Sequence, residues 1–150
     1  MTELRASRSV SRWFAGFMYV CASILALLVA AAVHGIDSFF AHSWLDPDKV
    51  APLAYAPLTA VCTGAGVALL AAGAVSLRWP RAAVFVAAAA WLAGLAAPLL
   101  LPWWQRSRGV EPFGGWDLFA AAWLVVLVPL CLAAVYGVVL ERRSVNGASA

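Results

Sequence analysis

Residues 52–104 decide the fold: they read PLAYAPLTAVCTGAGVALLAAGAVSL, then RWPR at 78–81, then AAVFVAAAAWLAGLAAPLLLPWW. Both apolar runs exceed the about 20 residues that a helix needs to cross a hydrocarbon core about 30 Å thick. Lipid offers no hydrogen-bond partner to an open backbone, so each run must be helical. The short turn between them predicts an antiparallel pair of neighbouring transmembrane helices.

Two further apolar runs, at 14–33 and 116–140, flank this hairpin. The chain is 65% hydrophobic and 11% charged, and a soluble domain of its 150 residues could not hide so much apolar surface from water. We therefore predict an all-α, integral membrane four-helix bundle that forms one domain over residues 1–150. Its helices run alternately up and down, with spans at 14–33, 52–77, 82–104 and 116–140.

Positive residues predict the orientation, because cytoplasmic loops carry an excess of Lys and Arg. The two tails and the central turn share one side and hold seven such residues: Arg5, Arg8, Arg12, Arg78, Arg81, Arg142 and Arg143. The other side holds three: Lys49, Arg106 and Arg108. We expect both termini in the cytoplasm. The excess of arginine over lysine and the many alanines are typical of a bacterial protein, which places the chain in the bacterial inner (cell) membrane.

Small residues follow one face of the second and third spans. Such residues let helix backbones approach closely, and hydroxyl groups can hydrogen-bond between helices. We predict that these two faces pack against each other or against a partner helix, while a ligand groove along Tyr55, Thr59 and Thr63 is an alternative. The predicted packing face comprises Thr59, Cys62, Thr63, Gly66, Gly73, Ala83, Ala87, Ala90 and Gly94.

No Asp, Glu, Lys, Arg or His lies in the middle of any predicted span. Ionisable residues at membrane depth usually mark ion paths, proton relays or substrate sites. Their absence disfavours proton-coupled transport and acid–base catalysis in the bilayer core. No nucleotide fingerprint, catalytic triad or Cys-x-x-Cys pair occurs either, so we expect no catalytic residue, no cofactor and no nucleic-acid partner.

The first outer connection, residues 34–51, carries apolar residues at helical spacing, which predicts a short segment lying on the outer interface. His34 with Asp37, and His42 with Asp46, have the spacings that bring helical side chains together. Two histidines and two aspartates could ligate a metal ion, although solvated pairs of this kind are common.

Arg106, Arg108 and Glu111 lie in the second outer connection. Two outer arginines run against the orientation rule and therefore need a reason. We expect them to pair with the aspartates of the first outer connection, namely Asp37, Asp46 or Asp48. The alternative is that they bind an anionic ligand, a lipid headgroup or an acidic partner surface.

Three functions remain open at this point. The first is a non-enzymatic accessory or scaffold subunit that packs against a larger membrane complex. The second is a small homo-oligomeric transporter or channel, with a path near Pro98 and Pro129 that reaches Thr59 or Thr63. The third is an outward-facing metal or redox site at His34 and His42. The bilayer and other membrane subunits, or further copies of the chain, are the expected partners.

Overall fold

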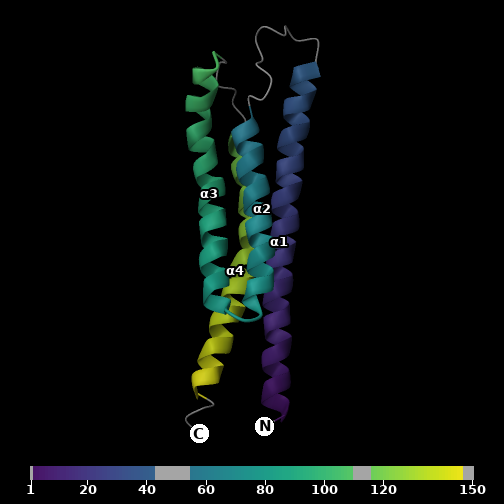
Figure 1. The fold of residues 1–150 in the computed structure, drawn as a ribbon, viewed down its shortest axis with the longest axis vertical. Coiled ribbons are helices and arrows are strands. Elements are labelled where there is room, and N and C mark those ends of the chain that lie inside the picture. The colour runs from purple at the N-terminus through teal and green to yellow at the C-terminus, as the bar shows by residue number, and fades with distance from the viewer. Residues whose placement is uncertain (1, 43–54, 110–115, 147–150) are drawn as a thin grey trace.

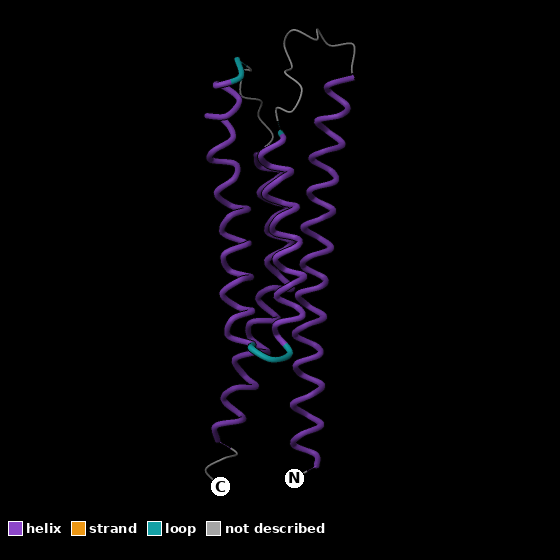
Figure 2. Tube along the Cα trace, in the orientation of Figure 1, coloured by secondary structure: helices purple, strands orange, loops and turns teal. Residues whose placement is uncertain are grey.

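Four long helices make up the described part of the computed structural model, which comprises residues 2–42, 55–109 and 116–146, with side chains at 10–39, 55–109, 118–137 and 139. The helices are α1 (Thr2–His42), α2 (Ala56–Ser76), α3 (Pro80–Ser107) and α4 (Trp116–Asn146). They stand side by side as a bundle (Figures 1 and 2). The predicted all-α, four-helix membrane fold is confirmed, because each helix contains a stretch long and apolar enough to cross a membrane.

The helices alternate in direction, so both termini lie at the same end of the bundle (Figure 1). The α2–α3 turn, residues 77–79, lies towards that end as well (Figure 2). Proline at the first helical position begins α3 cleanly, because it has no backbone N–H to leave unpaired there. Two ends can therefore be distinguished: the terminal end, with residues 77–81, and the opposite end, with Tyr55 and Arg108.

α1 is longer than the sequence predicted. The expected outer interfacial segment began at residue 34, but residues 34–42 continue α1 without a break. No proline interrupts this stretch, and Gly35 alone does not end a helix whose apolar residues keep the helical period. Residues 43–51 of the predicted segment lie outside the described residues. α1 begins at Thr2 and is roughly 60 Å long at about 1.5 Å per residue, so it projects beyond the hydrocarbon.

Neighbouring helices pack unequally around the bundle. α1 packs closely on α2 and on α4, and α2 packs closely on α3, whereas α3 and α4 contact each other much less. α3 continues through Pro98 and Pro102, and α4 continues through Pro129, so the prolines do not break either helix. The weak α3–α4 edge is the place where the bundle is least complete.

Candidate functional site: a groove between α3 and α4

The α1–α2 seam is built on small residues. A Cβ added at Gly73 would lie 3.3 Å from the Gly16 carbonyl oxygen, so the two backbones nearly touch. About two turns further along the seam, the buried Ser23 hydroxyl donates a hydrogen bond to the Gly66 carbonyl oxygen at 2.7 Å. Close backbone approach and interhelical hydrogen bonds of this kind hold transmembrane helices together. The α1–α2 seam is therefore a closely packed side of the bundle.

The predicted small-residue face of α2 turns largely towards α1. Cys62, Gly66 and Gly73 are buried. Thr59 is half-buried, and its hydroxyl donates to the Tyr55 carbonyl oxygen at 3.4 Å, close to its own helix. Thr63 is exposed on the outside of the bundle. The two threonines therefore do not converge on one polar path.

The predicted face of α3, which comprises Ala83, Ala87, Ala90 and Gly94, is buried along its length. Gly94 meets α4, where a Cβ at this position would overlap the indole ring of Trp123. The Trp123 side chain is fully buried, and its Nε1 donates a hydrogen bond to the Trp91 carbonyl oxygen at 2.9 Å. Phe119 stacks on the same indole, with ring centroids 6.0 Å apart. This contact joins the two helices at one level.

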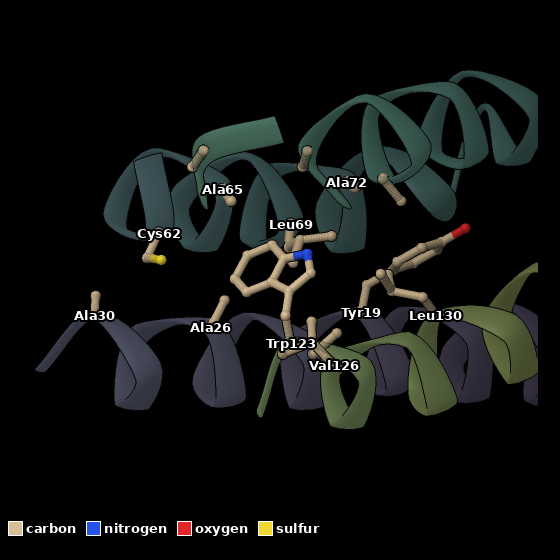
Figure 3. Packing of buried hydrophobic residues seen from close by; sticks show 14 of the residues in the cluster. Tyr19, Ala26, Ala30, Cys62, Ala65, Leu69, Ala72, Trp123, Val126 and Leu130 are labelled. Atoms are coloured by element: carbon tan, nitrogen blue, oxygen red, sulfur yellow. The ribbon is translucent and has the colours of Figure 1, made fainter. Parts of the chain in front are cut away.

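Sequence reasoning did not single out Trp123. The sequence does place this tryptophan inside a span and not at the headgroup level. That position could have indicated a buried helix–helix contact, because a buried indole N–H needs a hydrogen-bond acceptor. Figure 3 shows the indole of Trp123 rising from α4 across the middle of the core.

Nearer to the terminal end, α3 and α4 enclose a groove with a volume of about 160 Å³. We call it the α3–α4 groove. Its lining is almost wholly apolar. The lining residues are Tyr19, Val84, Ala87, Ala88, Trp91, Leu127, Leu130, Cys131 and Ala134.

Tyr19 forms the floor of the groove from α1, and Figure 3 shows its ring beside Leu130 with the hydroxyl directed away from α1. Among the residues that the structure describes, the Trp91 indole N–H is buried without a hydrogen-bond partner. The Cys131 thiol lies on an exposed part of the rim. The groove thus offers shape and apolar contact, with very little polar surface.

Of the three aspartates predicted to pair with the outer arginines, only Asp37 lies among the described residues. Arg106 and Arg108 are exposed, and the Arg108 guanidinium lies 4.9 Å from the centre of the Trp104 ring. Asp37 is buried at the same end, close enough to Tyr55 that burial first, and then the negative charge of Asp37, raises the pKa of the Tyr55 phenol. Within the described residues no ion pair joins Asp37 to either arginine. Asp46, Asp48 and Glu111 lie outside them.

The candidate metal residues are only partly described. His34 is exposed and Asp37 is buried, although both lie on α1. The His42 side chain and Asp46 lie outside the described residues. Over the part of the chain that is described, no group of three or more His, Cys, Asp or Glu could hold a metal ion.

No known protein-family model, curated protein or solved structure matches the chain. The fold therefore defines the class: an α-helical membrane protein with four candidate spans and a groove along its weakest helix–helix edge.

Proposed function

We propose that this protein is a non-enzymatic accessory or scaffold subunit of a larger membrane complex, and that a transmembrane helix of a partner protein packs against the α3–α4 groove. The observation that carries this proposal is the groove itself. Three of the four helix–helix edges are closely packed, and the fourth leaves a hollow lined by apolar side chains.

A helix suits the groove because small residues form part of its lining. Ala87, Ala88 and Ala134 allow a third backbone to approach α3 and α4 closely, as at other transmembrane helix contacts. A cavity of about 160 Å³ has room for one large apolar side chain, since an apolar cavity of about 150 Å³ accepts benzene. The expected partner is therefore an uncharged helix that inserts one such side chain.

Binding fits the lining better than catalysis does. The groove offers one thiol, Cys131, and one phenol, Tyr19, but its lining contains no carboxylate or imidazole to activate them. Nucleophilic catalysis needs a neighbouring base or a lowered pKa at the nucleophile. A transport path has less support, because Thr63 faces outward and the groove does not include Thr59.

The same proposal places the protein in the bacterial inner membrane with both termini in the cytoplasm. Both termini lie at one end of the bundle, and the sequence gives that end seven of the ten positive residues. Cytoplasmic loops carry such an excess.

Cys131 allows a direct test, because its thiol is a natural attachment point on the groove rim. In a Cys21→Ala/Cys62→Ala background, a thiol-linked photo-cross-linker at Cys131 is activated in native membranes, and the adducts are identified by mass spectrometry. We expect an adduct with a different membrane protein. The matched control moves the thiol by one residue, through Cys131→Ala with Leu132→Cys, to an exposed position at the same depth that does not line the groove.

The two positions must differ for the proposal to stand. A protein adduct that forms several-fold more from position 131 than from position 132 supports it. Adducts with lipid alone, or equal yields from both positions, would overturn it. An adduct between two copies of the chain would replace the accessory role with self-association, as the transporter or channel alternative requires.

A further inference from the structure

Arginine and tryptophan side chains gather at the terminal end of the bundle, around the α2–α3 turn. Arg12 reaches from α1 to the α2–α3 turn, where its Nη1 donates a hydrogen bond to the Leu77 carbonyl oxygen at 3.4 Å. This contact holds its guanidinium beside the backbone that leads into Arg78. Arg78 and Arg81 then flank Trp79 in the turn and the first residues of α3. We call Arg12, Arg78 and Arg81 the turn arginines.

The turn arginines are all exposed, and they lie at the level where the apolar spans stop. α2 ends as a candidate span at Ser76, and α3 begins as one at Pro80. Trp13 and Trp79 are 66% and 67% exposed at this level. Exposed tryptophans at the ends of spans sit among lipid headgroups. The arginines are therefore held where phosphate groups of lipids lie.

In the sequence, the two terminal segments and the α2–α3 turn carry seven arginines and two acidic residues, Glu3 and Glu141, so positive charge is in excess at this end. Among the side chains that the structure describes, the only carboxylate belongs to Asp37, and it lies at the opposite end beside Tyr55. Guanidinium groups bind phosphate through paired N–H donors, which a lysine ammonium cannot match. Negatively charged lipids are also the lipids that basic residues at a membrane surface attract most strongly.

We propose that the turn arginines form a binding site for the phosphate of an anionic phospholipid, whose acyl chains run beside Trp13 and Trp79. The site lies at the terminal end of the bundle, whereas Arg106 and Arg108 lie at the opposite end. It does not depend on the α3–α4 groove. A lipid is a better occupant than free phosphate because the flanking side chains are tryptophans, which place the site against hydrocarbon.

The test compares equal charge changes at the two ends of the full-length protein. Wild type, Arg12→Gln/Arg78→Gln and Arg106→Gln/Arg108→Gln are reconstituted in nanodiscs made of equal amounts of phosphatidylcholine and phosphatidylglycerol. Native mass spectrometry then measures which lipid stays bound after the protein is released from the nanodisc. Each arginine near an anionic surface contributes about fivefold in affinity, so the first double variant should retain about 30-fold less phosphatidylglycerol. The second should lose much less.

Additional variants separate the effect of charge from that of paired hydrogen-bond donation. Arg12→Lys/Arg78→Lys should retain more phosphatidylglycerol than the glutamine pair and less than wild type, because charge survives but paired donation does not. If the glutamine pair fails to fold, Arg78→Gln against Arg108→Gln gives the same comparison. The proposal would be overturned if both glutamine pairs lost phosphatidylglycerol equally, or if wild type showed no preference for this lipid. It would also be overturned if added inorganic phosphate released the lipid, or if an acidic protein were retained in its place.

Discussion

A glycine–tryptophan contact helps to join α3 to α4. Gly94 provides the space for the Trp123 indole, and the indole N–H in turn satisfies the Trp91 carbonyl oxygen at 2.9 Å. A buried indole N–H without an acceptor would be costly, so the size of residue 94 and the position of α4 depend on each other. The edge with the fewest contacts thus contains one closely fitted contact.

Gly94→Ala should therefore destabilise the bundle. The added methyl group overlaps the Trp123 ring and would push α4 away from α3, at a cost of about 1–3 kcal/mol in the free energy of unfolding. Gly64→Ala is the matched control, because nothing lies within 4 Å of a Cβ there and alanine favours a helix by about 1 kcal/mol. Unfolding in mixed micelles with increasing dodecyl sulfate measures both. Equal stability of the two variants would contradict the contact.

Tyr55 should make stability depend on alkaline pH. Burial first, and then the charge of Asp37, raises its pKa above the ordinary value of 10.0. The unfolded chain therefore releases this proton first as the pH rises, which favours unfolding. The contribution is complete below pH 10.0 and is lost as the pH rises through the folded-state pKa. Tyr55→Phe should flatten the fall in unfolding free energy as the pH rises above 10.0. An unchanged slope would show that Tyr55 titrates as it does in the unfolded chain.

At the scale of helices, the α3–α4 groove can be filled from within. Ala88 lines the groove and is exposed, so Ala88→Leu places a larger apolar side chain in the hollow without overfilling the core. We expect the unfolding free energy to change by less than about 1 kcal/mol, while cross-linking of a partner from Cys131 falls several-fold. Ala89→Leu, an exposed neighbour that does not line the groove, is the control. Undiminished cross-linking in Ala88→Leu would place the partner elsewhere.

Most of the helical content could be predicted from the sequence, because span length and backbone satisfaction in lipid leave no alternative. The end of α1 was harder to predict, since residues 34–42 satisfy both an interfacial helix and a continued one. The groove could not be predicted. Its existence depends on how far each helix is rotated about its axis, and the alanine-rich faces of α2 and α3 fit several rotations. Contacts such as Trp123 on Gly94 select one of them.

The molecule as a whole is polarised along the membrane normal. The terminal end carries Trp13, Trp79 and the turn arginines, and α1 extends beyond the α2–α3 turn there (Figure 1). The opposite end carries Asp37 and the exposed Arg108. Since the helices alternate in direction, the side of the membrane on which one connection lies fixes the side of every other connection.

Single cysteines at the two ends should therefore be labelled from opposite sides. In a chain whose native cysteines are replaced by alanine, Arg108→Cys should react with a membrane-impermeant maleimide on intact cells. Arg78→Cys should react only after permeabilisation. Neither change reverses the arginine and lysine bias: Arg78→Cys still leaves six positive residues against three, and Arg108→Cys strengthens the difference. The reversed pattern would place the termini outside, and labelling of both positions on intact cells would mean that the chain inserts in both orientations. Either result would remove the cytoplasmic assignment of the termini and leave the helix packing unchanged.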